Sequence, residues 1–331
     1  PINNLKPTVI LVSMDGFRYD YVDKFAPPTI SRLAKVGVRA KSMIPSFPTK
    51  TFPNHYTVAT GLYPQNHGLV ENNVYDFGTV FTMSKFDEVT NPRWWGGEPI
   101  WVTTEKQGQH SAAYFFVGTG TQIADHLPSY WRHYNGRVPP EMRVDKLLSW
   151  LDQPVTERPT MLTLYFSDTD DVGHEFGPGA EETKYAAWNV DRYIERLMNG
   201  LRARKIDKKV NVILVSDHGM APVDQRNAII MDDLFDIEDK KIADPILTTG
   251  EIWQIFPKPG KEDYIIDRLK NIKQATCWRK SEIPARLHYS EGKRIAPIVC
   301  SSDEGWFMTT KRRHDEQKKS PDFAQTRGAH G

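Results

Sequence analysis

Aspartate and histidine residues recur in four short clusters that lie far apart in this sequence. The clusters are Asp15 in VSMDGF, Asp170 to His174 in DDVGH, Asp217 and His218 in VSDHGM, and His330 in the terminal GAHG. Carboxylate oxygens together with imidazole nitrogens suit a borderline divalent ion such as Zn²⁺, and a ligand set without cysteine is typical of catalytic rather than structural zinc. The clusters therefore predict a single metal centre that is assembled from distant segments.

Three of these clusters directly follow short apolar runs that we predict to be β-strands. The runs are Val9 to Val12, Leu162 to Phe166 and Val212 to Val215. Each is apolar throughout, as is typical of parallel strands that are covered on both faces. Ligands in open α/β sheets gather outside the carboxyl ends of the strands, so the acidic side chains can converge at that edge.

Helical periodicities alternate with the strand-like runs. Helices are expected from about Ile30 to Gly37, from Met142 to Leu151, over residues 182–204 and from Asp263 to Leu269. This alternation predicts an α/β fold with a largely parallel central sheet and helices on both faces. We interpret residues 1–331 as one domain, in which about 221–310 form a less regular insertion that caps the sheet.

Composition excludes several broad classes of protein. With 43 Lys and Arg against 42 Asp and Glu, the formal charge of +1 gives no general attraction to nucleic acid or to an anionic membrane. No stretch is apolar enough to span a membrane, and the first residues, PINNLKPT, lack the core of a signal peptide. The two cysteines, Cys277 and Cys300, could form a disulfide or stay as two buried thiols.

A longer stretch joins these clusters into a recognisable pattern. PTKTFPNHY at 48–56 is followed by ATGLYPQNHG at 59–68 and by Glu71, Asn72 and Asn73. Together with MDGF, DDVGH, SDHGM and GAHG, these motifs resemble the nucleotide pyrophosphatase/phosphodiesterase family of the alkaline phosphatase superfamily. The resemblance spans residues 8–331, and WWGGEPIW at 94–101 with CWRKSEIPAR at 277–286 is most like the compact bacterial members. It implies the three-layer fold of alkaline phosphatase.

The resemblance also implies a role for each motif residue. Thr51 falls where the family has its nucleophile, and Asn72 where it has the side chain that binds a phosphoryl oxygen. Two Zn²⁺ ions per chain are implied. The ligands of the first, which also touches Thr51, match Asp15, Asp217 and His218, and those of the second match Asp170, His174 and His330. Zinc bound to a threonine hydroxyl lowers its pKa, so that it can attack phosphorus without a histidine base.

Three aromatic residues match family positions that line a nucleobase slot: Phe52, Tyr134 and Tyr165. The expected activity is hydrolysis of nucleoside 5′-phosphodiester or pyrophosphate bonds to nucleoside 5′-monophosphates, through a covalent threonyl-nucleotide intermediate. Alternatives are a choline-headgroup or lysophospholipid phosphodiesterase, a phosphomonoesterase on the same metal core, and a non-catalytic zinc-bound recognition protein. A sulfatase is disfavoured because neither cysteine lies in a C-x-P-x-R context. We expect no sequence-specific binding of nucleic acid.

Other interpretations stay open for single residues. Phe52, Tyr134 and Tyr165 could instead pack in the core. Seven further histidines are expected at the surface: His55, His67, His110, His126, His133, His288 and His314. The resemblance implies a monomeric, exported protein. Family members usually continue past the H-G motif with a strand and helices, so the C-terminal end of the domain is expected to be truncated at Gly331.

Overall fold

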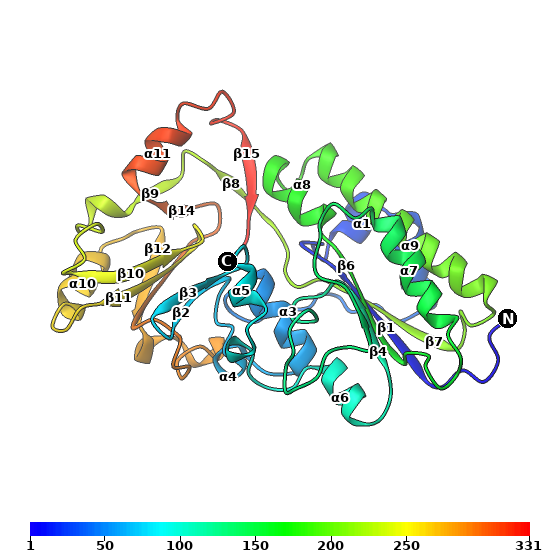
Figure 1. Cartoon of the computed structure of the whole chain (residues 1–331). Helices are drawn as coiled ribbons and strands as arrows, with labels where there is room; N and C mark the ends of the chain where they lie inside the picture. The colour runs from blue at the N-terminus through cyan, green and yellow to red at the C-terminus, as the bar shows by residue number, and fades with distance from the viewer.

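A five-stranded parallel sheet lies at the centre of the computed structural model, which describes all residues 1–331 (Figure 1). Its strand order is β5-β4-β6-β1-β7. The strands are β1 Thr8–Met14, β4 Ser111–Tyr114, β5 Tyr130–Trp131, β6 Met161–Phe166 and β7 Val210–Val215. The three strands predicted from the apolar runs are thus direct neighbours, with β1 between the other two, and this prediction is confirmed.

The register of β1 sets the positions of the acidic clusters. Ser13 lies opposite Tyr165 of β6 on one side and opposite Val215 of β7 on the other. The residues that follow all three strands therefore emerge at one edge of the sheet. The expectation that all three apolar strands are covered on both faces was wrong for β7, which is an edge strand. Ile213 is 49% exposed there, so an apolar sequence did not mean cover on both faces.

Helices cover both faces of the sheet, as predicted. Alternate β1 residues point to opposite sides, so that Ile10 and Val12 join one core cluster and Leu11 joins another. The first face is covered by α1 Tyr21–Phe25, α2 Pro28–Val36, α7 Pro140–Leu151 and α9 Glu181–Ala203. The second face packs on α3 Thr51–Thr60 and α6 Ile100–Lys106.

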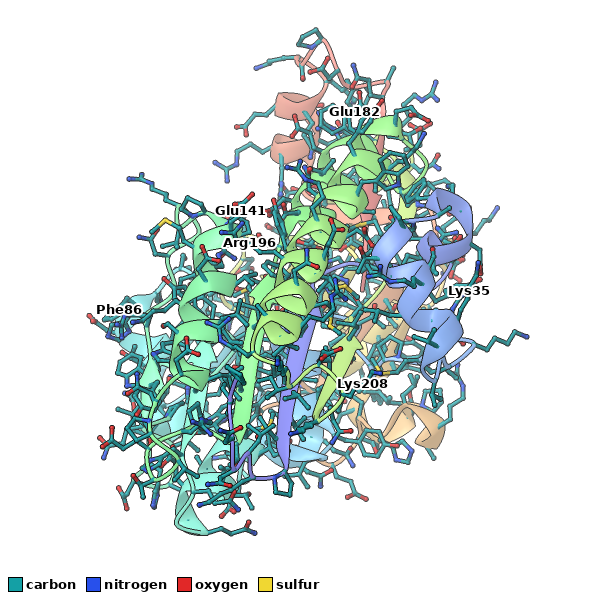
Figure 2. All side chains as sticks on the ribbon, turned by 90° about the vertical axis from the view of Figure 1, so that its right-hand side faces the viewer. Lys35, Phe86, Glu141, Glu182, Arg196 and Lys208 are labelled. Atoms are coloured by element: carbon teal, nitrogen blue, oxygen red, sulfur yellow. A yellow bond between two sulfur atoms is a disulfide. The ribbon has the colours of Figure 1, made fainter.

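The long helix α9 follows its apolar stripe. Its core positions are completely buried: Ala187, Val190, Ile194, Leu197 and Leu201. Figure 2 shows α9 along its face of the molecule, with Glu182 and Arg196 on the outer side. Arg196 forms an ion pair there with Asp145 of α7 at 2.6 Å. The spacing of apolar residues therefore predicted both the helix and its buried face.

Residues 221–310 contain a second sheet, which is more regular than the sequence pattern indicated. Four antiparallel strands lie in the order β10-β11-β13-β12. They are β10 Ala243–Thr248, β11 Ile252–Pro257, β12 Ala275–Arg279 and β13 Ile298–Ser302, with α10 Glu262–Leu269 packed beside β12. Cys277 and Cys300 face each other across β12 and β13 and form a disulfide, which settles the question left open by their spacing.

Three two-stranded ladders connect these parts. The last strand, β15 Thr326–Ala329, pairs with β8 Ala221–Asp224 and carries the end of the chain back towards the central sheet (Figure 1). The other two ladders are β14 Phe307–Thr309 with β9 Ala228–Ile230, and β2 Asn73–Asp76 with β3 Thr79–Thr82.

The remaining elements are short. They are α4 Pro64–His67, α5 Phe86–Val89, α8 Asp168–Phe176, α11 Lys311–Gln317 and the 3-10 turns Pro92–Trp94, Met231–Asp233, Lys280–Glu282 and Ala285–Leu287. None of the helices combines the length and the apolar character that crossing a bilayer requires.

Candidate metal centre and nucleophile

The acidic clusters meet where β1, β6 and β7 end. Gly16 follows Asp15 with a positive φ of 66°, and a Cβ there would come within 2.8 Å of the Asp170 Cα. Only glycine allows β1 and the first turn of α8 to approach this closely. The glycine in MDGF therefore brings the Asp15 and Asp170 segments together.

The first ligand group consists of Asp15, Asp217 and His218, and it is buried. His218 Nε2 lies 3.2 Å from Asp15 Oδ1 and 3.1 Å from Asp217 Oδ2. Its Nδ1 donates to the Gly219 carbonyl at 2.8 Å, so Nε2 is left to face the carboxylates. The backbone N–H of Gly16 donates to Asp217 Oδ1 at 3.2 Å. All three side chains thus present one polar atom to a shared space.

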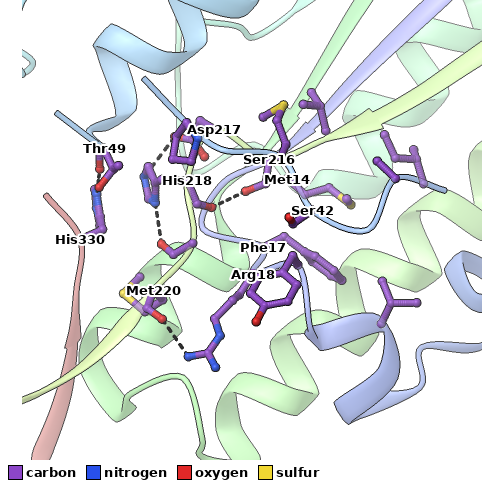
Figure 3. A pocket seen from close by; sticks show the side chains of 18 of the residues that line it. Met14, Phe17, Arg18, Ser42, Thr49, Ser216, Asp217, His218, Met220 and His330 are labelled. Atoms are coloured by element: carbon purple, nitrogen blue, oxygen red, sulfur yellow. Dashed lines mark hydrogen bonds and ion pairs between the residues drawn. The ribbon is translucent and has the colours of Figure 1, made fainter. Parts of the chain in front are cut away.

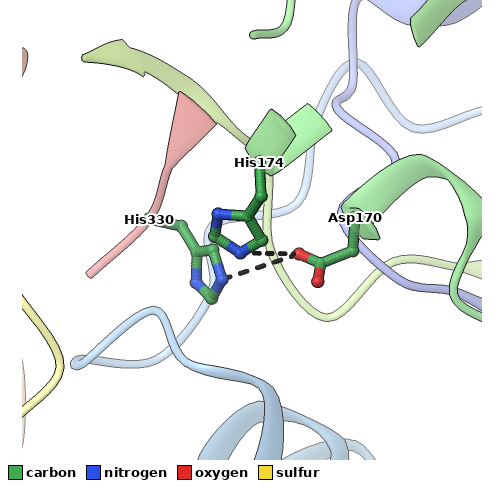
Figure 4. Close-up of side chains that lie close together, drawn as sticks. All are labelled: Asp170, His174 and His330. Atoms are coloured by element: carbon green, nitrogen blue, oxygen red, sulfur yellow. Dashed lines mark ion pairs between the residues drawn. The ribbon is translucent and has the colours of Figure 1, made fainter. Parts of the chain in front are cut away.

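The second ligand group consists of Asp170, His174 and His330 (Figure 4). Asp170 and His174 are one helical turn apart on α8, and His330 follows β15. The Nε2 atoms of His174 and His330 lie 3.4 and 3.6 Å from Asp170 Oδ1. Their Nδ1 atoms are held by the carbonyls of Gly328 and Thr49, at 2.9 and 2.5 Å. The structure therefore brings together all six ligands predicted from the sequence.

The hydrogen bonding of the carboxylates tests whether these residues fit a metal ion. Three buried oxygens have no hydrogen-bond partner: Asp15 Oδ1, Asp170 Oδ1 and Asp217 Oδ2. Unpaired buried carboxylate oxygens are costly, and here they converge on one another. The ligand atoms of Asp170, His174 and His330 lie within 4.8 Å of one another, and the same holds for Asp15, Asp170 and His218 and for Asp15, His55 and Asp217. Both the Asp and His donor atoms and the unpaired carboxylate oxygens therefore fit a divalent metal ion.

Charge repulsion in the cluster points the same way. Burial and the neighbouring Asp15 raise the pKa of Asp170 to about 8, and burial and Asp217 raise the pKa of Asp15. Burial alone would lower the pKa of His218, but Asp217 and Asp15 raise it well above its usual value. The cluster therefore holds an excess of negative charge that positive charge must balance.

Thr51 and Asn72 lie beside the first ligand group. Thr51 is the first residue of α3, and its hydroxyl lies 3.3 Å from His218 Nε2. Asn72 Oδ1 accepts a hydrogen bond from the Phe52 backbone N–H at 2.9 Å, which leaves the Nδ2 amide able to donate to a ligand. Because the Phe52 N–H is used by Asn72 and Pro53 has no N–H, the Thr51 N–H is the first-turn donor of α3 that suits an anion.

A cavity of about 1420 Å³ opens next to these residues (Figure 3). Its lining includes Asp217, His218 and His330, together with residues of β7 and of the segments 36–43 and 301–306. Figure 3 shows Thr49 and His330 next to His218, and the His330 and His218 rings stack with their centroids 3.4 Å apart. Two residues of the first ligand group, Asp217 and His218, therefore border this cavity, whereas Asp15 and Thr51 are not part of its lining.

Of the three predicted slot residues, Tyr134 and Tyr165 are neighbours, and each of the three has different surroundings. Phe52 packs its ring against Phe81 and Trp95, with centroids 5.6 and 6.2 Å apart. Tyr134 is 62% exposed, and its ring lies 6.1 Å from that of Tyr165. Tyr165 points its hydroxyl at the metal cluster and donates to Asp15 Oδ2 at 2.5 Å. Only Tyr134 has the exposure that a stacking surface needs.

His55 is a functional candidate that the sequence analysis missed. It was expected at the surface, but it is buried on α3 one turn after Thr51, with Nδ1 2.9 Å from the Thr51 carbonyl. Nε2 lies 2.8 Å from the Ser13 hydroxyl, and Nδ1 lies 3.2 Å from Asp217 Oδ2. The spacing of four residues from Thr51 was the available signal, because it places both side chains on one helix face.

The surface expectation was also wrong for two other histidines. His67 and His314 are buried, whereas His110, His126, His133 and His288 are partly or fully exposed. His67 lies within hydrogen-bonding distance of the Thr57 hydroxyl and the Pro53 carbonyl, at 3.0 and 3.2 Å. Burial lowers the pKa of His67 to about 3, so this side chain stays neutral inside the fold.

Comparison with known proteins agrees with this arrangement. A family model described as type I phosphodiesterase / nucleotide pyrophosphatase matches residues 9–331. An uncharacterized pyrophosphatase/phosphodiesterase of Schizosaccharomyces pombe is 36% identical over 330 residues, covering 95% of this chain and 67% of the relative. A venom phosphodiesterase of Macrovipera lebetinus is 37% identical over 321 residues, covering 93% of this chain but 37% of the relative. The chain thus spans only part of the length of these relatives.

Solved structures agree with the fold. Murine ectonucleotide pyrophosphatase / phosphodiesterase 5 superposes with a TM-score of 0.88 at 34% identity, covering 98% of this chain and 84% of the other. An inactive variant of that murine protein, solved in complex with AMP, gives the same TM-score at 32% identity. The alkaline-phosphatase-like α/β fold predicted from the sequence is thereby confirmed.

Proposed function

Because the chain belongs to the type I phosphodiesterase / nucleotide pyrophosphatase family, we propose that it hydrolyses nucleoside 5′-phosphodiester or pyrophosphate bonds and releases nucleoside 5′-monophosphates. One observation carries the proposal. The Thr51 hydroxyl lies 3.3 Å from His218, at the edge of a cluster whose buried carboxylate oxygens lack partners. A nucleophile placed beside unmet cation ligands is the arrangement that metal-assisted phosphoryl transfer requires.

Two zinc ions are the proposed cofactors. The first would be held by Asp15, Asp217 and His218 beside Thr51, and the second by Asp170, His174 and His330. When bound, zinc would lower the pKa of the Thr51 hydroxyl and of water and neutralise charge on the phosphoryl oxygens. Asp and His donors favour zinc over magnesium, which prefers an all-oxygen set.

Thr51 is the proposed nucleophile of a two-step reaction. The Thr51 hydroxyl releases its proton to solvent and its Oγ forms a bond to phosphorus while the bond from phosphorus to the leaving oxygen breaks. This gives a threonyl-nucleotide and an alcohol or phosphate product, whose leaving oxygen takes up a proton from solvent. Water then attacks the same phosphorus, the Thr51 ester bond breaks, and the hydroxyl regains its proton. No histidine base is needed, because a bound metal would lower the pKa of the hydroxyl. His218, 3.3 Å from that hydroxyl, is a proposed metal ligand, and His55 holds the Thr51 carbonyl.

Two donors of this chain suit the charge that develops on phosphorus oxygens. Asn72 has its Oδ1 fixed by the Phe52 N–H, so its Nδ2 is oriented before the substrate arrives. The backbone N–H of Thr51, the first residue of α3, supplies a second donor. Donors that are held in place before the reaction stabilise a transition state at little reorganisation cost.

A nucleotide substrate is the best-supported choice. The murine relative was solved with AMP, and Tyr134 offers an exposed ring for stacking, which contributes about 1 to 3 kcal/mol per base. A choline-headgroup phosphodiester is the second candidate, because Phe52 packs on Phe81 and Trp95 and so contributes less open surface to a base slot.

We also propose that the protein works outside the cytoplasm. The Cys277–Cys300 disulfide supports this, because structural disulfides persist in oxidising compartments. Relatives with venom and ectoenzyme names point the same way.

The test is a comparison of three chromogenic esters: thymidine 5′-(4-nitrophenyl phosphate), 4-nitrophenyl phosphate and 4-nitrophenyl phosphocholine. We expect fast, chelator-sensitive cleavage of the nucleotide diester, lost in Thr51→Ala. Thr57→Ala is the matched control, because its hydroxyl lies on the same helix but is near Ser46 and His67. Faster cleavage of the phosphocholine ester would replace the nucleotide substrate, and no metal-dependent turnover of any ester would refute the proposed activity.

A further inference from the structure

Tyr165 occupies a position that its sequence motif did not reveal. It lies on β6 directly opposite Ser13 of β1, and the backbone N–H of Asp15 donates to the Phe166 carbonyl at 2.9 Å. The pairing of the two strands therefore fixes Tyr165 and Asp15 relative to each other. Across this pairing the Tyr165 hydroxyl donates to Asp15 Oδ2 at 2.5 Å.

This hydrogen bond gives the two carboxylate oxygens of Asp15 different roles. Oδ2 is occupied by Tyr165, whereas the buried Oδ1 has no hydrogen-bond partner and lies 3.2 Å from His218 Nε2. A carboxylate held by one oxygen can no longer rotate freely about its Cβ–Cγ bond. The oxygen that remains points into the shared space of the first ligand group.

Neighbouring rings keep the Tyr165 hydroxyl in this direction. Its ring packs edge-to-face against His55 on one side, at 5.4 Å, and against Tyr134 on the other, at 6.1 Å. His55 is itself within hydrogen-bonding distance of Ser13 and the Thr51 carbonyl. The aspartate is thus braced by side chains that are themselves fixed to β1 and α3.

We propose that Tyr165 is a positioning residue for the first metal ligand group, and that it orients Asp15 so that Oδ1 alone faces the ion. Tyr134, whose ring is 62% exposed, is the residue of this pair that offers a stacking surface. This inference rests on the proposed zinc-dependent function. Outer hydrogen bonds of this kind typically change metal affinity or activity by about 10-fold to 100-fold when they are removed.

The two tyrosines provide a matched pair of substitutions. Tyr165→Phe removes only the hydroxyl and keeps the ring between its neighbours, and Tyr134→Phe makes the same change on the exposed ring. Tyr134→Ala removes the stacking surface. Zinc affinity is measured by competition with a chromogenic chelator, kcat and KM with the thymidine diester, and thermal stability on the zinc-free proteins.

For Tyr165→Phe we expect zinc affinity at the tighter site to fall by about 10-fold to 100-fold. Its kcat should fall at subsaturating zinc and recover at high zinc, with KM changed less than twofold. Tyr134→Phe should match the wild type in zinc affinity, and Tyr134→Ala should raise KM with zinc affinity unchanged. A merely structural role for Tyr165 would lower the melting temperature of the zinc-free protein without the recovery at high zinc.

The possible results distinguish the positioning role of Tyr165 from the proposed zinc-dependent activity on which it rests. Unchanged zinc affinity in Tyr165→Phe, beside a zinc-dependent wild type, would overturn the positioning role and leave the proposed function intact. If Tyr165→Phe raised KM for the thymidine diester and left zinc affinity unchanged, Tyr165 would be a substrate-binding residue rather than a positioning residue. If the wild type bound no zinc, the proposed function and the positioning role would both be refuted.

Discussion

The two ligand groups of the candidate metal centre are built by different means. Asp15, Asp217 and His218 follow two adjacent strands of the central sheet, and their side chains are almost fully buried. In the second group the histidine of α8, His174, has 43% of its side chain exposed, and His330 comes from a strand in a separate two-stranded ladder. One group is part of the main sheet, and the other forms where separate segments meet.

The supports of the two groups differ accordingly. Asp15 and Asp217 receive hydrogen bonds from Tyr165 and from the Gly16 backbone, both at fixed positions beside the sheet. His330 depends on the nucleophile segment, through its bond to the Thr49 carbonyl and through the ammonium of Lys50, which donates to the His330 carbonyl. For the proposed two-zinc centre we therefore expect a preorganised first site that binds zinc tightly and a second site whose affinity depends on how its segments dock.

The largest expected effect comes from the buried group. Asp217→Asn removes a charge that Gly16 and two histidines face, so zinc binding at the first site and activity should fall together, with activity reduced by roughly 10³-fold or more. Steady-state hydrolysis of the thymidine diester with parallel zinc analysis checks this. Asp171→Asn, which changes the neighbouring acid on α8 bonded to Ser167, is the control and should stay close to wild type.

Removing His330 should break the second group and leave the first. We expect His330→Ala to bind one zinc ion per chain instead of two and to lose roughly 10²-fold in kcat, because the ions act in concert on attacking and leaving oxygens. Metal analysis after dialysis, beside Thr326→Ala on the same strand, measures the stoichiometry. Loss of both ions from His330→Ala would show that the two groups are not independent, contrary to the comparison.

Stepwise removal of zinc should show that the first site binds zinc more tightly than the second. Zinc that binds only the folded protein stabilises it by about 4 kcal/mol when the free ion is at 1,000 times its Kd. Titration with chelators of rising affinity should therefore lower the melting temperature in two steps, with the smaller step first. A single step, or a larger first step, would contradict a weaker second site.

The smallest effect is expected from the buried ion pair that braces His330. Lys50 Nζ lies 2.8 Å from Glu251 Oε2 of the segment before β11. Glu251→Gln keeps a hydrogen-bond acceptor but removes the charge, so affinity at the second site should fall by less than about tenfold with the first site unchanged. Competition titrations resolve the two sites, and an equal loss at both would place Lys50 in the support of the whole centre.

Local sequence patterns predicted the parts of the site that depend on strand ends. Three apolar runs followed by acids predicted β1, β6 and β7 and the edge where Asp15, Asp170 and Asp217 meet, because parallel strands deliver their ends to one side. The motif resemblance added Thr51, Asn72 and His330, which no periodicity could have placed.

Features that depend on register between distant strands were not predictable in the same way. Tyr165 and Asp15 are 150 positions apart, and only the pairing of β6 with β1 shows that the tyrosine hydroxyl reaches the carboxylate. His55 was expected at the surface because its burial depends on Ser13 and Asp217 from two other strands. The exposure of Ile213 likewise follows from the position of β7 in the strand order, which its own composition does not specify.

The most direct test of the two-zinc assignment is an anomalous-scattering map at the zinc edge from crystals grown with zinc. We expect two peaks, one bounded by Asp15, Asp217, His218 and the Thr51 hydroxyl, and one bounded by Asp170, His174 and His330. A single peak, or two peaks of which neither lies next to Thr51, would contradict a two-zinc centre with a threonine nucleophile.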